Sequence, residues 1–249
     1  MTHSLNSFFK SFWLAVQFFT RWPTPQYASV SEQEMGRSLA WFPLIGLLIG
    51  LVLWALSGLQ AWLPTPVVAL VLLLAWVWIT GALHIDGAAD FADAWLGSCG
   101  HKQRALEIMK DSRIGTGGGV AIGLILLAKW VLLTELLQTD WLVLLVLIPF
   151  WARIGSLVLM MTTPYASQNG MAETMFRHLN RKIAWLWLVF AFGLMLVLAP
   201  GLVLMVLAWF WVRWLLMRHL GGMNGDGAGM MTEVLEISAL LILSASLIH

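Results

Sequence analysis

The chain has 249 residues, of which 60% are hydrophobic and only 11% are charged. Soluble domains are about 45–50% apolar and about 25% charged, so this composition excludes a soluble globular protein, a disordered chain and a collagen-like fibre. The net charge of +1 provides no basic surface for nucleic acid, which argues against a nucleic-acid-binding protein. The single cysteine, Cys99, cannot form an internal disulfide.

The first predicted element is an amphipathic helix near the N-terminus. Apolar side chains recur at helical spacing, and no small-residue cleavage site follows, so the segment is not a secretory signal peptide. The apolar positions are Phe8, Phe9, Phe12, Trp13, Val16 and Phe19. We expect residues 1–38 to form a cytoplasmic interfacial segment with this helix on the membrane surface. The alternative is a further helix packed in the core.

The rest of the chain contains seven predicted transmembrane helices, since a spanning helix needs about 20 mostly apolar residues. These segments are 39–59, 66–83, 117–137, 141–162, 183–198, 202–217 and 230–248. The seventh is the weakest because Glu233 and Glu236 lie near its start. The 16 tryptophans are typical of membrane–water interfaces. We therefore predict an all-α protein in which residues 1–249 form a single membrane domain, a polytopic helical bundle.

The basic residues give the predicted bundle an orientation. Eleven of the 14 Lys and Arg residues fall in segments that alternate on one side of the membrane, namely 1–38, 84–116, 163–182 and 218–229. The opposite connections, 60–65, 138–140 and 199–201, contain none. Because basic residues accumulate on the cytoplasmic side, we expect a bacterial inner-membrane protein with a cytoplasmic N-terminus.

The most informative segment runs from His84 to Asp93 and contains a stripe of carboxylates. Asp86, Asp90 and Asp93 are spaced so that all three lie on one helix face. The three carboxylates repel one another, and a bound divalent cation would neutralise this repulsion. Carboxylate ligands suit Mg²⁺ or Mn²⁺. The alternative is a solvated acidic helix start.

A second acidic, glycine-rich element lies at 221–236, on the same predicted side of the membrane. It contains Asn224, Gly225, Asp226 and Glu233, and the interval from Asp226 to Glu233 matches that from Asp86 to Asp93. Both elements contain Asp-Gly-Ala. We therefore expect the two elements to form one metal site with ligands Asp86, Asp90, Asp93, Asp226 and Glu233. The alternative for the second element is a glycine-rich turn with a capping Asp.

Two further groups of residues are candidates for phosphate binding. The run from Lys110 to Gly119 precedes a span, and its glycines allow backbone N–H groups to approach an anion at a helix N-terminus. Within this run the candidates for phosphate binding are Lys110, Arg113, Gly115 and Thr116, and Asp111 is a candidate catalytic residue together with Asp86, Asp90 and Asp93. Lys129 and Arg153 are cations inside spans; either they bind phosphate in a cavity beneath the metal site or they form a structural ion pair, with Glu135 as a candidate partner.

Taken together, these segments resemble the cobalamin synthase family, also called adenosylcobinamide-GDP ribazoletransferase. The resemblance is carried by the segments His84–Asp93, Glu107–Thr116 and Gly221–Asp226, and it extends to 19–25 and 42–46. Two positions depart from the family pattern: Asn224 stands where Thr is usual, and Gly227 where a larger residue is common.

The resemblance implies a reaction and roles for the candidate residues. Adenosylcobinamide-GDP would react with α-ribazole or its 5′-phosphate to give adenosylcobalamin or its phosphate and GMP, with Mg²⁺ gripping the diphosphate. Asp93 would be the general base, and Arg104, Lys110 and Arg113 would neutralise phosphate oxygens. Asp226 and Glu233 would complete the metal site or orient the ribazole. A homo-oligomer or an association with other enzymes of the pathway would be compatible with this reading.

Two other functions remain open at the level of the sequence. A CDP-alcohol phosphotransferase shares Asp clusters and Mg²⁺ chemistry, but its motif places Ala-Arg where this chain has Ala89-Asp90. An ion transporter would use the same carboxylates. However, its charged residues are expected at the membrane midplane, whereas these cluster at one edge.

Overall fold

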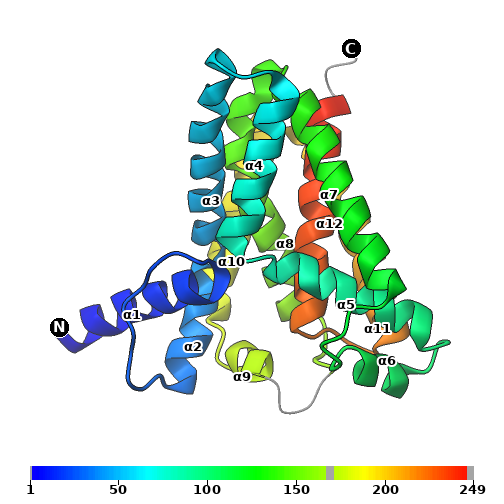
Figure 1. Ribbon diagram of the computed structural model, residues 1–249. Coiled ribbons are helices and arrows are strands. Elements are labelled where there is room, and N and C mark those ends of the chain that lie inside the picture. The colour runs from blue at the N-terminus through cyan, green and yellow to red at the C-terminus, as the bar shows by residue number, and fades with distance from the viewer. Residues whose placement is uncertain (1, 167–170, 246–249) are drawn as a thin grey trace.

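A computed structural model describes residues 2–166 and 171–245, which fold into a bundle of helices (Figure 1). The α-helices are α1 (Thr2–Phe19), α2 (Glu32–Ser38), α3 (Phe42–Ser57), α4 (Thr65–Thr80), α5 (Leu83–Gly97), α6 (Lys102–Ile108), α7 (Thr116–Leu136), α8 (Ile148–Thr162), α9 (Met171–Arg177), α10 (Arg181–Leu198), α11 (Met205–His219) and α12 (Gly225–Ala245). Short 3-10 segments are η1 (Leu39–Trp41), η2 (Gly58–Ala61), η3 (Asp140–Val146) and η4 (Pro200–Leu204). Since the described residues contain no β-strand, the all-α prediction is confirmed.

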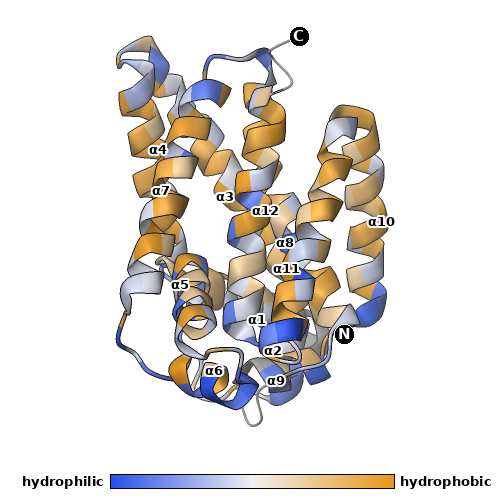
Figure 2. Cartoon of the chain, turned by 90° about the vertical axis from the view of Figure 1, so that its right-hand side faces the viewer, coloured by the Kyte–Doolittle hydropathy of each residue, from blue (hydrophilic) through white to orange (hydrophobic). Residues whose placement is uncertain are grey.

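The structure contains between five and seven helical segments that could cross a membrane, compared with the seven predicted. Among the described residues, five helical segments are long and apolar enough to cross a membrane: Glu32–Ala61, Thr116–Leu136, Arg181–Leu198, Pro200–His219 and Gly225–Ala245. Two bent pairs, α4 with α5 and η3 with α8, raise the number to seven if each counts as one span. Hydrophilic residues gather around α2, α6 and α9 at one end of the bundle, whereas its long helices are mostly hydrophobic (Figure 2). The prediction of a polytopic helical bundle is thereby confirmed.

The chain turns sharply between α4 and α5. Gly81 and Ala82 both adopt left-handed backbone conformations, with φ of 60° and 59°, and the two helices make an angle of 85°. A left-handed alanine costs about 1–2 kcal/mol, so tertiary contacts must hold the turn. The backbone N–H of Arg21 donates to the carbonyl of Ile79 at 2.7 Å, and the Arg21 side chain lies against Gly81. Consequently α4 ends three residues before the predicted boundary at 83, and α5 runs across the bundle instead of continuing the span (Figure 1).

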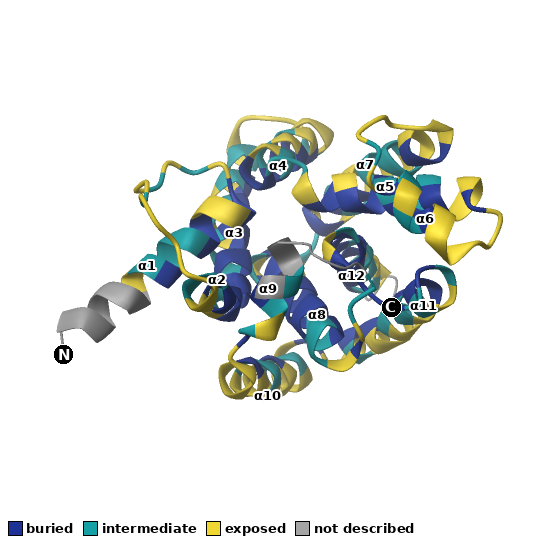
Figure 3. Cartoon of the chain, turned by 90° about the horizontal axis from the view of Figure 1, so that it is seen from below, coloured by how far each residue is buried: buried dark blue, intermediate teal, exposed yellow. Residues whose placement is uncertain are grey.

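Helix α12 is the central helix of the bundle and packs against α5, α7, α8 and α11 (Figure 3). It begins at Gly225, five residues before the predicted start of the last span at 230, and residues 246–248 of that prediction lie outside the described residues. The earlier start puts Asp226 in the first turn of the helix. Residues 225–236 of the acidic glycine-rich element therefore belong to α12, and residues 221–224 form a short segment before it.

Several tryptophans connect helices through their indole N–H groups. Trp187 donates to the carbonyl of Ala40 at 2.8 Å, Trp209 to that of Gly155 at 2.9 Å, and Trp151 to that of Ala191 at 3.2 Å. Such bonds are stable where no water competes for the carbonyl oxygen. The abundance of tryptophan thus reflects helix packing as well as the outward-facing positions typical of membrane interfaces.

The N-terminal helix α1 is amphipathic, as predicted, but only part of its apolar face points outward. Ala15, Val16 and Phe19 are buried against the bundle, whereas the Phe9 side chain is 57% exposed. The helix extends sideways from the bundle, near the end at which the hydrophilic residues gather (Figures 1 and 2). Its C-terminal half therefore fits the alternative of a packed helix, while its position on a membrane surface stays a prediction. The Phe8 side chain lies outside the described side chains.

Candidate functional site

The two Asp-Gly-Ala elements meet where α5 crosses the start of α12. A Cβ atom added to Gly87 would lie 2.7 Å from Cα of Asp226, and one added to Gly229 would lie 3.2 Å from Cα of His84. Side chains larger than hydrogen would therefore force the two helices apart at both positions. This close crossing puts Asp226 beside the carboxylates of α5, as expected from the sequence.

The carboxylates at this crossing repel one another. Asp86 is exposed, whereas Asp90 and Asp226 are half-buried. Burial, followed by the charges of Asp226, Asp86 and Asp93, raises the pKa of the Asp90 carboxyl to about 7. In the described part of the chain, no Lys, Arg or His forms a salt bridge with any of these four carboxylates. A cluster of like charges without a protein counterion favours binding of a cation.

Asp93 has a different partner. Its Oδ2 accepts the backbone N–H of Gly115 at 2.7 Å, and its Oδ1 accepts that of Gly118 at 2.8 Å. The carboxylate therefore caps the N-terminus of α7, where the helix dipole and the free N–H groups attract an anion. A Cβ atom on Gly115 or Gly118 would clash with this carboxylate. The glycine pattern correctly indicates an anion site, and the anion at Gly115 and Gly118 is the side chain of Asp93. Phosphate binding by Gly115 and Thr116 stays a prediction.

This cap changes the ligand set expected from the sequence. Over the ranges 2–166 and 171–245, no group of three or more His, Cys, Asp and Glu side chains is arranged to hold a metal ion. Each oxygen of Asp93 accepts one backbone N–H at the start of α7, so this carboxylate positions the helix, and its role as general base stays a prediction. Asp86, Asp90 and Asp226 are the carboxylates that remain together. Mg²⁺ often binds one or two carboxylates together with substrate phosphates, and these residues suit that arrangement.

Asn224 fixes the position of Asp226. Its side-chain oxygen accepts the backbone N–H of Gly227 at 2.8 Å, which caps the start of α12, and its amide nitrogen donates to Oδ2 of Asp226 at 3.0 Å. The preceding segment is tied to the loop after α8 by two backbone hydrogen bonds, Ala166 to Met223 and Met223 to Pro164. Asn224 is thus a positioning residue at the site, and Gly225 lies exposed beside it.

Tyr165, in the loop after α8, is a neighbour of the site that the sequence did not indicate. Burial and the charge of Asp226 raise the pKa of its hydroxyl. The nearest sequence signal was the segment 163–182, which lies on the predicted cytoplasmic side but matches the family pattern only loosely. The bridge between Tyr165 and Met223, just before α12, holds this loop next to the carboxylates.

The basic candidates lie on exposed segments after α5. Arg113 binds Asp111 through both carboxylate oxygens, with the shortest contact at 2.6 Å, and these hydrogen bonds lower the pKa of Asp111 to about 2. The Arg113 side chain is 88% exposed. Arg104 donates to the carbonyl of Gly97 at 3.3 Å, and Lys110 is exposed. Thr116, in the first turn of α7, is exposed as well. Lys110 and Thr116 are thus exposed to solvent, whereas Arg104 and Arg113 are held by hydrogen bonds to Gly97 and Asp111.

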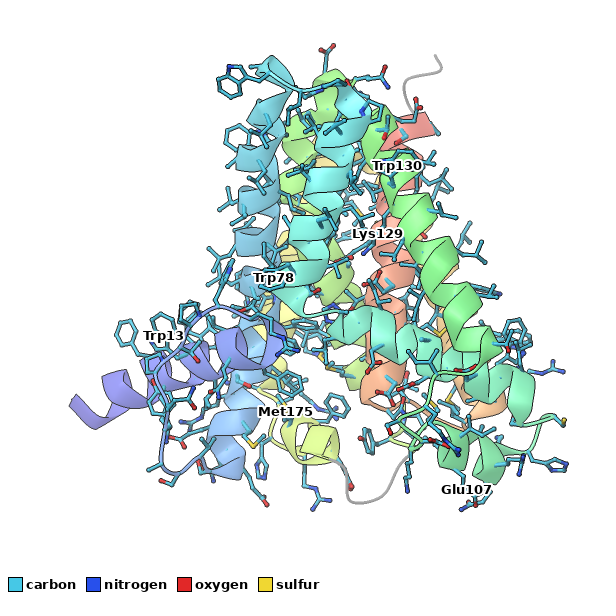
Figure 4. All side chains as sticks on the ribbon, viewed as in Figure 1. Trp13, Trp78, Glu107, Lys129, Trp130 and Met175 are labelled. Carbon is cyan, nitrogen blue, oxygen red and sulfur yellow. The ribbon has the colours of Figure 1, made fainter. Side chains whose placement is uncertain are left out.

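Lys129 and Arg153 belong to a buried ion-pair network inside the bundle. Lys129 Nζ lies 2.7 Å from Glu233 and 2.6 Å from Glu236, and Arg153 Nη1 lies 2.9 Å from the other oxygen of Glu236. Lys129 also lies over the ring of Trp76, at 4.5 Å from its centroid. Figure 4 labels Lys129 within the bundle, well away from the end that carries α6 and α9.

This network corrects three expectations from the sequence. Of the two alternatives for Lys129 and Arg153, the structure has the ion pair and not phosphate binding, and their partner is Glu236, whereas Glu135 is exposed. Glu233 lies with Lys129 and does not join Asp226. Seven residues are two helical turns, so Glu233 shares a helix face with Asp226 but lies about 10 Å further along the axis. The seven-residue spacing correctly predicted that Glu233 and Asp226 share a helix face. It did not predict that the two residues contact different groups because they lie at different positions along the helix axis.

Comparison with known proteins identifies the family to which the chain belongs. Residues 11–244 match the family model described as cobalamin-5-phosphate synthase. Proteins named adenosylcobinamide-GDP ribazoletransferase are similar over nearly the whole chain. One from Pseudomonas fluorescens is 40% identical over 92% of this chain and 96% of its own length. One from Pseudomonas putida is 42% identical over 95% and 99%, and one from Ectopseudomonas mendocina is 40% identical over 94% and 98%. No solved structure matches the chain. The chain therefore belongs to the cobalamin-5-phosphate synthase family.

Proposed function

We propose that this chain is the membrane transferase that joins adenosylcobinamide-GDP to α-ribazole, or to α-ribazole 5′-phosphate, and releases GMP. The product is adenosylcobalamin or its 5′-phosphate. The family membership and the names of the relatives support this reaction. The structural observation that carries it is the crossing of α5 and α12, which gathers Asp86, Asp90 and Asp226 without a protein counterion.

The carboxylates of α5 are the proposed holders of the cation. Asp86 and Asp90 would bind Mg²⁺, or Mn²⁺, which when present supplies positive charge to the diphosphate oxygens. Arg104, Lys110 and Arg113 lie on the exposed segments that follow α5 and would add further positive charge to the same oxygens. Asp111 contributes by holding the Arg113 guanidinium through its bidentate contact.

Asp226 is the proposed general base in place of Asp93. Its carboxylate is oriented by Asn224 and, unlike that of Asp93, does not cap a helix N-terminus. It would accept the proton of the ribose 3′-hydroxyl as that oxygen forms a bond to the phosphorus bearing the corrinoid side chain. The bond from this phosphorus to the oxygen shared by the two phosphoryl groups breaks, and GMP leaves with that electron pair. A positioned general base typically contributes about 10²–10⁴-fold in rate.

The location of the enzyme is also part of the proposal. The accumulation of Lys and Arg on alternate connections supports a bacterial inner-membrane protein whose N-terminus and carboxylate site face the cytoplasm. Both the substrates and the product GMP would then be exchanged directly with the cytoplasm. Assembly as a homo-oligomer or with other enzymes of the pathway is compatible with this arrangement.

A reconstituted assay tests the reaction. Purified protein in lipid vesicles is mixed with adenosylcobinamide-GDP, α-ribazole and Mg²⁺, and GMP and the corrinoid product are quantified by chromatography. We expect equimolar release of both, which stops when Asp90 is replaced in Asp90→Asn. The matched control is Asp140→Asn, because Asp140 is an exposed carboxylate in η3, far along the chain from either Asp-Gly-Ala element. Absence of GMP from the wild-type reaction would refute the proposed function.

A further inference from the structure

A largely apolar cavity adjoins the carboxylate cluster. It encloses about 150 Å³ and is bounded by residues of α1, α3, α5, α8, α9 and α12. Aromatic side chains form much of its wall: Phe18, Phe19, Phe42 and Phe176. Phe19 and Phe42 are stacked with ring centroids 4.0 Å apart. Met175 of α9, labelled in Figure 4, is another wall residue, close to the end of the bundle that carries the carboxylates.

The polar groups of the cavity are confined to the helix crossing. Asp226 and Gly225 line it from the start of α12, and His84 lines it from α5. The Nε2 atom of His84 is buried and, among the described residues, has no hydrogen-bond partner. In the part of the chain that the structure describes, no Lys or Arg lines the cavity. One boundary of the cavity is therefore the candidate catalytic carboxylate, and most of the rest is hydrocarbon and aromatic rings.

The residues that line the cavity indicate which chemical group of the two substrates it can bind. A diphosphate would meet no positive charge, and a guanine would leave most of its polar edge atoms unpaired against phenylalanine and methionine. The macrocycle of the corrinoid is much larger than about 150 Å³. A small, flat, weakly polar ring instead finds aromatic faces and edges with which it can stack.

We propose that this cavity binds the benzimidazole base of α-ribazole and so places its ribose at Asp226. This inference rests on the proposed function, because it assigns one of the two substrates to a part of the same site. With the base among Phe19, Phe42 and Phe176, the ribose lies toward the carboxylate cluster, where Asp226 accepts the proton of its hydroxyl. The cavity then sets the preference for the base, since its volume limits the substituents on the ring.

Met160 on α8 offers a way to change the volume without touching the carboxylates. It lines the cavity and is only partly buried, so a larger side chain there need not disrupt the core. Met160→Trp reduces the space and Met160→Ala enlarges it. The matched control is Val158→Trp, which places the same side chain two residues earlier on α8, where Val158 lines a separate apolar groove next to α10 and α11.

The experiment measures KM for each substrate with two nucleosides, α-ribazole and its analogue with an unsubstituted benzimidazole. We expect Met160→Trp to raise KM for α-ribazole by about tenfold or more, because the loss of room for one or two methyl groups in an apolar pocket has effects of this size. The unsubstituted analogue should be affected less, so the preference between the two bases shifts toward it. Met160→Ala should shift the preference the other way, and KM for adenosylcobinamide-GDP should not change in either variant.

Binding of α-ribazole alone separates this inference from the proposed function. The fluorescence of the benzimidazole is titrated with wild-type, Met160→Trp and Val158→Trp protein in the absence of the second substrate. Weakened binding in Met160→Trp but not in Val158→Trp supports the cavity even if no GMP is formed. Unchanged binding in Met160→Trp, or a rise in KM for adenosylcobinamide-GDP instead of α-ribazole, would overturn the inference while leaving the reaction itself intact.

Discussion

Substitution of Glu236 by glutamine should destabilise the protein strongly, although this residue lies away from the carboxylate site. The Glu236 carboxylate binds Lys129 with one oxygen and Arg153 with the other, and the side chains of Glu236 and Arg153 are both 0% exposed. Lys129 retains Glu233 after the substitution. Arg153 retains the backbone carbonyl of Pro149, and its Nε and Nη2 atoms already lack partners among the described residues. Glu236→Gln therefore leaves a buried guanidinium without a direct counterion.

The magnitude follows from this burial. Removal of one partner of a buried ion pair typically lowers the free energy of unfolding by about 3–5 kcal/mol, because the other charge stays in a medium of low polarity. An exposed pair gives a useful contrast. Arg177 and Glu173 form an i,i+4 pair at 2.9 Å in which the arginine is 70% exposed, and Glu173→Gln should cost only about 0.5 kcal/mol.

The two variants are compared with wild-type protein by equilibrium unfolding in mixed detergent micelles, with far-UV circular dichroism as the readout. A double variant, Arg153→Met with Glu236→Leu, adds a second test. Replacement of both charges by apolar groups removes the uncompensated guanidinium, so the double variant should be more stable than Glu236→Gln. A loss below about 1 kcal/mol for Glu236→Gln, similar to an exposed pair, would refute the assignment of this network as a buried structural element.

The remaining predictions concern the site and its location. Chelation with excess EDTA should abolish GMP release, and Mg²⁺ or Mn²⁺ should restore it; full activity in EDTA would rule out the proposed cation. Gly118→Ala should destabilise the start of α7 by about 1–3 kcal/mol, because its Cβ would displace the Asp93 carboxylate from its cap. Gly119→Ala, where a Cβ meets nothing within 4 Å, should be neutral or slightly stabilising in the same unfolding assay. Equal effects of the two alanines would contradict the capping role. In a Cys99→Ser background, cysteines introduced at the exposed positions 100 and 218 should react with an impermeant maleimide only from the cytoplasmic side; labelling from the periplasm would reverse the proposed orientation.

The sequence by itself determined the class of fold and the apolar segments that are candidates for crossing the membrane, and it predicted the side on which basic residues gather. These properties follow from composition and local periodicity, which act over one helix at a time. The same reasoning identified the two Asp-Gly-Ala elements, because residues spaced by four and three positions share a helix face whatever the helix packs against.

Only the tertiary structure decided which partner each charged residue takes. Periodicity gives the face of a helix but not its depth or its neighbour, so Glu233 was grouped with Asp226 although it pairs with Lys129 two turns further along α12. Asp93 was assigned to the cation, yet the N-terminus of α7 binds both of its oxygens. A helix N-terminus attracts any anion that can reach it, and which anion does so depends on how α5 and α7 pack. The crossing at Gly87 and Asp226 is likewise a long-range contact, formed because small residues let two helix backbones approach, and it creates the site that neither segment contains alone.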